Sequence, residues 1–397
     1  MRRRLEEYPP IRIQLLVGPR QVGKTTLLLE MAERHKSRAI YVSADAPEAA
    51  LPSWADGVWR QALDRAAREP AILLIDEIQY MPQWSRWLKA RFDEVRRKEI
   101  PLHVVVTGSS SLKIGAGAKE TMAGRFERLT LTHWGAADLV KLLRVPGDIA
   151  PERMVSHGGY PGAVAYWNDM ARWRNYLRDS VIEPAIGRDI LQMEVVRKPA
   201  LLRQLFALAM AHPAEILSLE KIVGSLAEKG ALETLAHYLE LLNEAFLVAN
   251  LRRYAGDEIR RRRSPPKLVV LNNALLAGSR ASPPPHADGN SSEWGRWLEN
   301  ACLAHAINAG QEVFYWREEP WEVDAVVRGS WGQWLVEVKS GEYGITDLRG
   351  LAKAAIKFPH FRPIVVCDPQ KESAAIAAGF KAVSWHNYLR DGLRANE

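Results

Sequence analysis

The sequence has 397 residues, which is long enough for two or three domains and too long for one continuous hydrophobic core. With 47% hydrophobic and 25% charged residues, and without an apolar stretch near the 18 or so residues that a membrane span needs, the composition argues against a membrane protein. The formal net charge of +7 is a modest excess that favours anionic partners such as nucleic acid.

Two further features of the composition concern the cellular compartment. The segment MRRRLEEYPP has basic residues but no apolar region behind them, so it does not have the pattern of a secretory signal, and we expect a cytoplasmic protein. Cys302 and Cys367 are too few and too isolated for a disulfide framework or a thiolate metal site. We expect two buried, reduced thiols.

The first motif lies in IRIQLLVGPRQVGKTTLLLEMAERH, where an apolar run, a glycine-bounded loop and a helical pattern follow one another. Its centre, GPRQVGKT, fits the phosphate-loop pattern G-x-x-x-x-G-K-[ST]. Glycines let backbone N–H groups surround a phosphate, and a helix that begins near Lys24 directs its positive dipole end at the anion. We expect Lys24 to reach the β- and γ-phosphates of ATP and Thr25 to bind Mg²⁺. The residues predicted to bind the nucleotide here are Gly18, Pro19, Arg20, Gln21, Val22, Gly23, Lys24, Thr25 and Thr26.

The second motif, AILLIDEIQ, reads as a strand buried on both faces of a parallel sheet. It ends in Asp76, which can hold the Mg²⁺ shell, and Glu77, which can orient or deprotonate the attacking water. A later strand, residues 102–111, ends in hydroxyl groups. Thr107 and Ser109 are candidates to sense the γ-phosphate, and a helix cap or turn explains them equally well.

Two more apolar runs, residues 39–45 and 126–132, complete a set of five strands that alternate with helices. This alternation predicts an α/β fold over residues 1–135, a P-loop domain with a doubly wound parallel sheet. The nucleotide is expected at the carboxyl edge of the strands.

Five blocks, GPRQVGKTT, LLIDEIQYMPQW, VVVTGSSSL, MAGRFERL and GGYPGAV, resemble those of bacterial and archaeal AAA-type ATPases that carry a carboxyl-terminal domain of unknown function. The resemblance implies ATP hydrolysis and, by analogy, a homo-oligomer such as a ring or dimer. It implies that Arg125 acts at the γ-phosphate of its own or a neighbouring subunit's nucleotide, with a salt bridge as the alternative. It further implies that Tyr160 and Pro161 form an apolar wall against adenine, with a simple turn as the alternative.

The middle of the chain is predicted to be helical. Residues 136–195 form a helical lid, and residues 196–278 give three helices followed by a strand, an order that suggests a winged helix-turn-helix, as the resemblance also implies. Glu233 and Glu240 lie on the outer face of the third helix, where they repel phosphate. We therefore expect this helix to pack against the ATPase domain and not to read DNA bases.

The hairpin that follows the third helix is rich in arginine, which predicts a surface that tracks the phosphates of DNA. A solvated charge run is the alternative. The candidate nucleic-acid residues are Arg252, Arg253, Arg260, Arg261, Arg262 and Arg263.

A segment rich in proline, serine and glycine, residues 279–292, reads as a linker to a last domain at residues 293–397. In that domain EVDAVVRGSWGQWLVEVKSG predicts a hairpin whose turn lies at Gly329 to Gly332. This register sets Asp324 opposite Glu337, close enough for two carboxylates to share a divalent cation, with Lys339 on the same face.

The order of helix, three strands, helix and strand around this hairpin resembles a PD-(D/E)XK nuclease-like α/β domain. The resemblance implies that Glu299, Asp324 and Glu337 bind Mg²⁺ or Mn²⁺ and that Lys339 positions the nucleophile or neutralises the transition state. The alternative is a salt bridge of Lys339 with Glu322, in a fold that has lost the chemistry.

Two functions remain after this reading. The first is an ATP-driven enzyme that acts on branched or broken DNA with a nuclease-like carboxyl-terminal domain. The second is a switch ATPase of the signalling type, in which nucleotide state changes assembly and the last domain only binds a partner or DNA.

Overall fold

The computed structural model describes residues 2–51, 53–108, 124–191, 196–225, 232–255, 264–287 and 291–394. Contacts along the chain divide it into two units, Met1–Thr132 and His133–Glu397. Within the described residues, no helix is long and apolar enough to cross a membrane.

The first unit is built on a parallel sheet with the strand order β2-β3-β4-β1-β5. This confirms the five strands expected from the sequence and the α/β fold of a P-loop domain. The strands are β1 (Ile13–Val17), β2 (Ala39–Ser43), β3 (Ala71–Asp76), β4 (Leu102–Gly108) and β5 (Phe126–Thr130).

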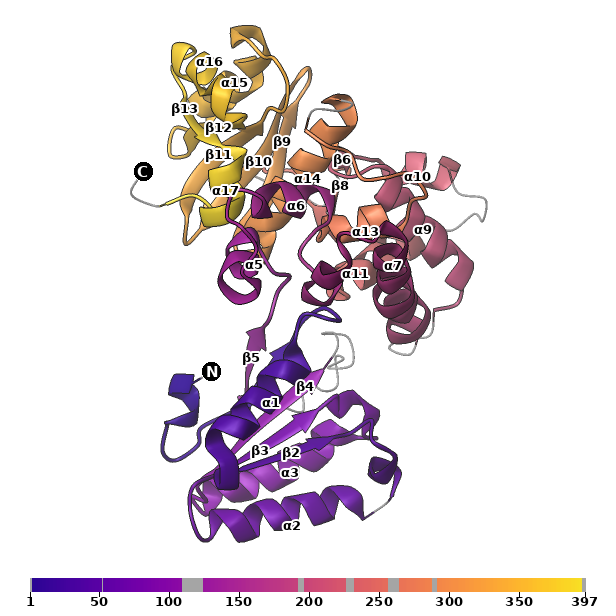
Figure 1. The fold of residues 1–397 in the computed structure, drawn as a ribbon, viewed down its shortest axis with the longest axis vertical. Helices are drawn as coiled ribbons and strands as arrows, with labels where there is room; N and C mark the ends of the chain where they lie inside the picture. Colours follow the sequence, from indigo (N-terminus) through magenta and orange to yellow (C-terminus); the bar gives the residue numbers. More distant parts are fainter. Residues whose placement is uncertain are drawn as a thin grey trace. The chain divides into compact units, whose positions relative to one another are not determined.

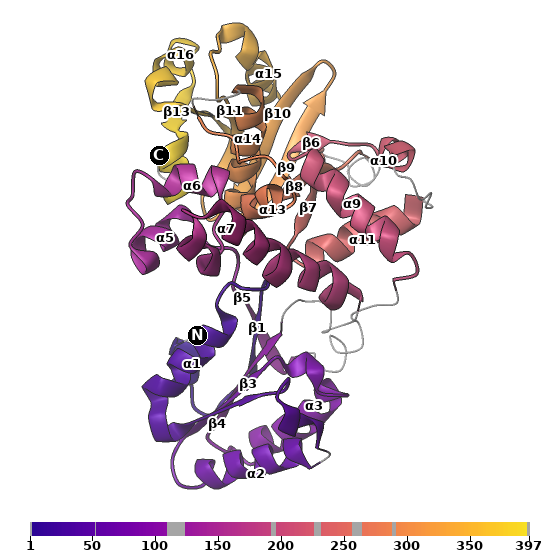
Figure 2. The same ribbon diagram turned by 45° about the vertical axis from the view of Figure 1, so that its right-hand side comes forward.

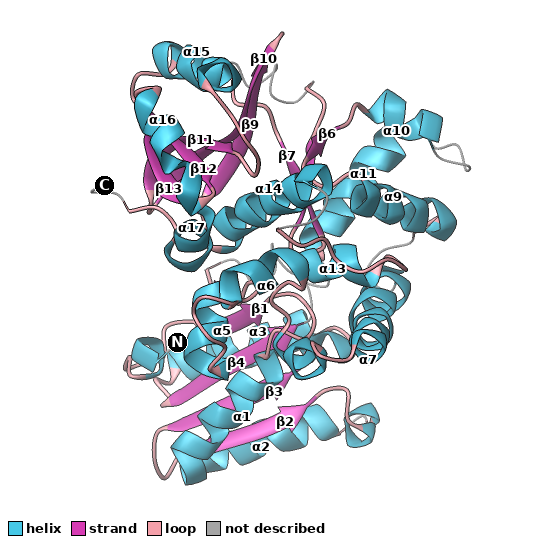
Figure 3. Cartoon of the chain, turned by 45° about the horizontal axis from the view of Figure 1, so that its top comes forward, coloured by secondary structure: helices cyan, strands magenta, loops and turns pink. Residues whose placement is uncertain are grey.

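Helices cover both faces of this sheet (Figures 1 and 3). The unbroken apolar run of β3 serves both layers, because successive side chains of a strand point to opposite faces. Leu73 and Ile75 join the core formed with α2 (Trp54–Ala66) and α3 (Trp84–Arg97), whereas Ile72 and Leu74 join the core formed with α1 (Lys24–His35).

The second unit begins with helices, and residues 177–190 continue them as two π-helical segments. The three segments expected as lid, winged helix and nuclease-like domain lie together in this one unit, and the predicted boundaries between them stay predictions. The first helices are α5 (Ala136–Leu143), α6 (Ala150–Ser156) and α7 (Met170–Tyr176).

A small antiparallel sheet follows, with the order β6-β8-β7, and Figure 2 shows α9 and α11 beside it. Along the chain the elements run helix, strand, helix, helix, strand, strand and a short last helix. They are α9 (Pro199–Ala211), β6 (Glu215–Ile216), α10 (Leu219–Ser225), α11 (Leu232–Glu244), β7 (Val248–Leu251), β8 (Lys267–Val270) and α13 (Asn273–Gly278).

The carboxyl-terminal sheet has the order β13-β12-β11-β10-β9, with antiparallel pairs from β9 to β11 and parallel pairs from β11 to β13. Side chains of α15 pack on one face of this sheet. The elements are α14 (Ser291–Asn308), β9 (Glu312–Glu318), β10 (Trp321–Gly329), β11 (Gly332–Val338), α15 (Arg349–Lys357), β12 (Arg362–Cys367), α16 (Glu372–Ala377), β13 (Lys381–Ser384) and α17 (Trp385–Asp391).

Candidate functional site

The phosphate-loop motif joins the end of β1 to the start of α1, and two of its glycines are required by the backbone. A Cβ atom on Gly18 would lie 2.1 Å from the carbonyl oxygen of Leu131, whose N–H donates to Val17 O at 2.8 Å. Gly23 has a φ of +94°, in the left-handed region that glycine adopts at little cost. The spacing of the motif therefore matches the turn that the chain makes here.

Lys24 turns its ammonium into this loop. Its side chain is almost fully buried, and Nζ donates to the carbonyl oxygens of Gly18 at 3.0 Å and Pro19 at 2.7 Å. Thr25 and Thr26, in the first turn of α1, are exposed. The arrangement leaves a cation and two hydroxyl groups at the amino end of a helix, which is where anions bind favourably.

Asp76 lies buried at the carboxyl end of β3, between two neighbouring strands that each supply a hydroxyl group. Thr107 of β4 donates to Asp76 Oδ1, and Tyr41 of β2 donates to Oδ2 at 3.2 Å. The backbone N–H of Glu77 donates to Oδ1 at 3.1 Å. Burial and the adjacent Asp76 raise the pKa of Tyr41 to about 12, so its hydroxyl group remains a donor at neutral pH.

Glu77 follows with a φ of 50°, a left-handed conformation that is uncommon for residues with a side chain. Its N–H also donates to Thr107 Oγ1 at 3.0 Å, and its carboxylate accepts from Gln79. Burial raises the pKa of Glu77, while Gln79 and the charge of Lys24 lower it. Thr107 thus touches both predicted catalytic-edge acids, and its role as a γ-phosphate sensor stays a prediction.

Arg125 lies at the other edge of the sheet, immediately before β5. It forms a bidentate ion pair with Asp93 of α3, with distances of 2.7 Å for Nε–Oδ1 and 3.1 Å for Nη2–Oδ2. The hydrogen bond with Arg125 holds the pKa of Asp93 below its usual value. The structure therefore shows the salt bridge that was the alternative and does not bring Arg125 to the phosphate loop. Its part in hydrolysis stays a prediction.

Tyr160 and Pro161 belong to the second unit. Tyr160 is 1% exposed and lies edge-on to His133, with 5.3 Å between ring centroids. The Tyr160 ring therefore has no open face for adenine, and the predicted adenine wall stays a prediction. Ser109 and the arginines at 260–263 lie outside the described residues.

The carboxyl-terminal hairpin has the register expected from its sequence. Ala325 pairs with Val336, and Gly329 pairs with Gly332 across the turn. One residue before this ladder, Asp324 accepts a hydrogen bond from the N–H of Val338 at 2.8 Å. Lys339 Nζ donates to Glu337 Oε1 at 2.7 Å, so its partner is Glu337 and not Glu322.

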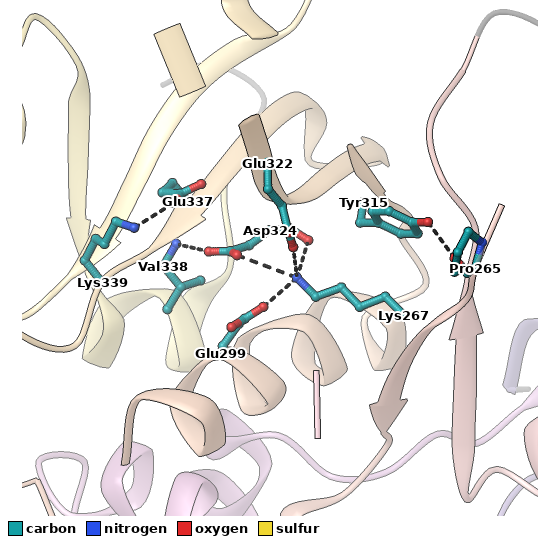
Figure 4. A network of polar contacts seen from close by, with 9 residues as sticks. All are labelled: Pro265, Lys267, Glu299, Tyr315, Glu322, Asp324, Glu337, Val338 and Lys339. Atoms are coloured by element: carbon teal, nitrogen blue, oxygen red, sulfur yellow. Dashed lines mark hydrogen bonds and ion pairs between the residues drawn. The ribbon is translucent and has the colours of Figure 1, made fainter. Parts of the chain in front are cut away.

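A residue that the sequence did not single out lies among these acids. Lys267 of β8 is 1% exposed, and its Nζ is 2.6 Å from Glu299 Oε1, 3.4 Å from Glu322 Oε1 and 3.6 Å from Asp324 Oδ1 (Figure 4). It also donates to the carbonyl oxygen of Asp324 at 3.4 Å. The only signal in the sequence is a lysine placed at the start of the apolar run KLVV.

Burial dominates the electrostatics of this acid cluster, which we define as Glu299, Glu322, Asp324 and Glu337. It raises the pKa values of Glu299 and Glu337 to about 8, and the charge of Asp324 raises both further. Burial alone would lower the pKa of Lys267, but Glu299, Asp324 and Glu322 raise it overall, so the ammonium stays charged.

The acid cluster does not have the arrangement of a metal site. Across the described ranges, no group of three or more histidine, cysteine, aspartate or glutamate side chains is placed to hold a metal ion. The predicted ligands Glu299 and Asp324 meet at a lysine nitrogen, and Glu337 meets Lys339. The residues present therefore do not fit Mg²⁺ or Mn²⁺ here.

Of the predicted nucleic-acid residues, the described ones are Arg252 and Arg253. Arg252 Nη2 is 3.8 Å from Glu240 Oε1 of α11, and both side chains are about half exposed. Arg253 forms a bridge to Tyr315 of β9. In α11, Leu235 is buried and Glu233 is exposed, as the helical pattern indicated.

Three family models match the sequence. Residues 11–139 match a family described as AAA domain, residues 150–282 match a domain of unknown function (DUF8612), and residues 294–388 match a second domain of unknown function (DUF4143).

Similar proteins include uncharacterized proteins of Mycobacterium bovis and Mycobacterium tuberculosis, each 28% identical over 257 residues, or 63% of this chain. The chain covers about half (51%) of the length of these relatives. Among solved structures, a Walker-type ATPase of Pyrococcus abyssi has a TM-score of 0.46 at 16% identity, over 70% of this chain and 93% of that one. The Orc1 protein of Aeropyrum pernix, solved in complex with DNA, has a TM-score of 0.31 at 14% identity, over 70% and 89%. By its family matches and strand order, the chain combines an AAA-type ATPase domain with two domains of unknown function.

Proposed function

We propose that the protein binds ATP with Mg²⁺ at the carboxyl edge of β1, β3 and β4 and hydrolyses it there. The observation that carries this proposal is the network around Asp76, a buried carboxylate positioned by hydroxyl groups from both neighbouring strands. Carboxylate and hydroxyl oxygens suit Mg²⁺, so Asp76 and Thr25 are the residues that would hold it. The ion supplies neutralisation of the phosphate charge.

The other residues of the site divide the remaining tasks. Lys24 and the backbone N–H groups of the loop bind the phosphates, and the close packing at Gly18 holds that backbone in place. Glu77 orients the attacking water and accepts its proton. The strained backbone of Glu77 supports this assignment, because such conformations persist where the surroundings impose them and are frequent at active sites.

Two substitutions test this proposal. Lys24→Ala should abolish nucleotide binding, whereas Glu77→Gln should keep binding and stop turnover. Binding is measured by equilibrium titration with a fluorescent ATP analogue and turnover by phosphate release. Glu33→Gln, an exposed residue of α1, is the matched control. Parent-like turnover by Glu77→Gln would remove Glu77 from the mechanism.

DNA is the proposed partner. The helix, strand, helix, helix, strand, strand order around β6, β7 and β8 supports a winged helix-turn-helix, and the arginines at 252, 253 and 260–263 supply cations on the hairpin between β7 and β8. The acidic exposed face of α11 argues against base reading by that helix, so we propose contacts to phosphates only.

Phosphate contacts predict affinity that depends on salt and not on sequence. Fluorescence anisotropy with linear, single-stranded and four-way DNA should give dissociation constants that rise with salt concentration. Changing the six arginines to alanine should flatten this dependence, and Arg96→Ala together with Arg97→Ala on α3 controls for total charge. If the six-residue variant binds all three DNAs as the parent does, the partner is not DNA through this hairpin.

A switch ATPase is the second candidate function. The observation that favours it is the acid cluster, which contains a lysine in place of a metal. In this function, nucleotide state changes the assembly of the protein, and the carboxyl-terminal domain binds its partner without cleaving it. Sizing the protein with ADP and with a slowly hydrolysed ATP analogue, with and without DNA, separates the two candidates.

A further inference from the structure

The acid cluster carries its own cation. Lys267 Nζ lies between the carboxylates of Glu299, Glu322 and Asp324, at 2.6, 3.4 and 3.6 Å, and near the Asp324 carbonyl oxygen at 3.4 Å. An ammonium group has three N–H donors, so these four oxygen atoms account for its hydrogen-bonding capacity. Only 1% of the side chain is exposed.

This position is the one that a shared metal ion would need. A divalent ion bound by Glu299 and Asp324 has to lie between their oxygen atoms, with Mg²⁺–oxygen distances of about 2.0–2.1 Å. The lysine nitrogen already lies there. The second oxygen of Asp324 accepts from the N–H of Val338, so both oxygens of this carboxylate are engaged.

Contacts on both sides of Lys267 fix the strand that carries it. Asn300, the neighbour of Glu299, is fully buried and binds the backbone of β8 twice: Oδ1 accepts from Val270 N at 2.9 Å, and Nδ2 donates to Val270 O at 2.8 Å. On the other side, Tyr315 donates its hydroxyl group to Pro265 O at 2.5 Å. The placement of the lysine is therefore imposed by the backbone around it.

One atom argues for a bound cation. Glu337 Oε2 is buried and has no hydrogen-bond partner within the described part of the chain. Its other oxygen binds Lys339. A single carboxylate oxygen provides one ligand, whereas Mg²⁺ and Mn²⁺ sites need several oxygen ligands.

We propose that Lys267 is the resident cation of the acid cluster, that it excludes divalent metal ions, and that the nuclease-like domain is for this reason not a metal-dependent nuclease. The cluster instead joins β8 to the carboxyl-terminal sheet through charge pairs. The proposal rests on the proposed nuclease-like fold in its choice of acids, and its test does not depend on ATP hydrolysis.

The test measures Mn²⁺ binding to the full chain without nucleotide, by electron paramagnetic resonance of free Mn²⁺ and by thermal unfolding with Mn²⁺ or with EDTA. The variant Lys267→Met removes the charge and keeps a side chain of similar length. Lys353→Met, an exposed lysine of α15, controls for the substitution itself. Adding Asp324→Asn to each protein identifies binding that belongs to the cluster.

We expect the parent and Lys353→Met to show no Mn²⁺ binding that Asp324→Asn removes. Lys267→Met should gain such binding, at least about tenfold tighter than the parent, and its melting temperature should rise with Mn²⁺. If the parent binds Mn²⁺ in a manner sensitive to Asp324→Asn, or if folded Lys267→Met gains no site, the proposal is wrong.

Removing the ammonium leaves three acids close together, so Lys267→Met has a second form that keeps the charge balance. Lys267→Met combined with Glu322→Gln removes one positive and one negative charge and retains Glu299, Asp324 and Glu337. The same gain of Mn²⁺ binding is expected. The comparison of the parent with its Asp324→Asn variant decides the question without either lysine variant.

Discussion

Arg125 and the phosphate loop lie at opposite ends of the same parallel strands. Arg125 directly precedes β5, whose first residue Phe126 pairs with Ile13, and β1 then runs five residues to Val17 before the loop begins. At about 3.3 Å per residue, roughly 13 Å of strand separates the two edges. One side chain does not cover that distance, so we expect Arg125 to act on the nucleotide of a neighbouring subunit.

A mixing experiment tests this expectation. Arg125→Ala removes the arginine and keeps the loop, whereas Lys24→Ala removes nucleotide binding and keeps the arginine. Losing an arginine that stabilises phosphoryl transfer lowers the rate by about 10³–10⁵, or about 4–7 kcal/mol. Each variant alone should be inactive. Random assembly of an equimolar mixture should restore about a quarter of the parent rate, because half the subunits bind ATP and half of their neighbours supply Arg125.

The assay is phosphate release at saturating ATP, after co-purification of two differently tagged variants has shown that mixed oligomers form. Asp93→Asn is the control, since it removes the ion-pair partner and leaves the guanidinium. If Arg125 serves only the salt bridge, Asp93→Asn and Arg125→Ala lower stability alike and both retain turnover. Mixed oligomers no more active than their components would refute action between subunits.

Three further predictions concern the rest of the molecule. Thr107→Val should reduce turnover at saturating ATP, because it deprives Asp76 of a donor and leaves a buried N–H without its acceptor; such losses cost about 1–3 kcal/mol, and Thr107→Ser should restore the rate. Gly18→Ala should lose nucleotide binding, since its Cβ would lie 2.1 Å from Leu131 O; calorimetric titration with ATP checks this, and parent-like affinity would contradict the packing argument. Burial lowers the pKa of His157 from 6.5 to about 3, so on acidification the unfolded state takes up a proton that the folded state refuses. Between pH 7 and 5 this should lower the free energy of unfolding by about 2 kcal/mol relative to His157→Gln, as measured by urea unfolding, and equal pH slopes would show that His157 is not shielded.

The features that sequence patterns predicted well are those set by local chemistry. Alternation of apolar runs with helical patterns predicted the five strands of the first unit, and the glycines at 329 and 332 fixed the hairpin register because a tight turn needs them. The order of strands within a sheet and the partners of charged residues depend on how elements pack, which local periodicity does not encode.

The acid cluster illustrates this limit. Lys267 and Asp324 interact across a separation of 57 residues, and the backbone contacts of Asn300 that align β8 with α14 follow no sequence motif. Arg125 likewise pairs with Asp93 at a separation of 32 residues. A pattern of residue types named the acids correctly as a group, but only the packed structure shows which cation lies among them.

The origin of Lys267 in a strand that precedes the last domain matters for anyone who studies that domain alone. A fragment limited to residues 293–397 would retain the carboxylates of Glu299 and Asp324 and leave their ammonium partner behind. Its excess negative charge would draw ions from the buffer, and any hydrolysis of DNA that it showed would be a property created by the truncation. Biochemical work on this region therefore belongs on polypeptides that include β8.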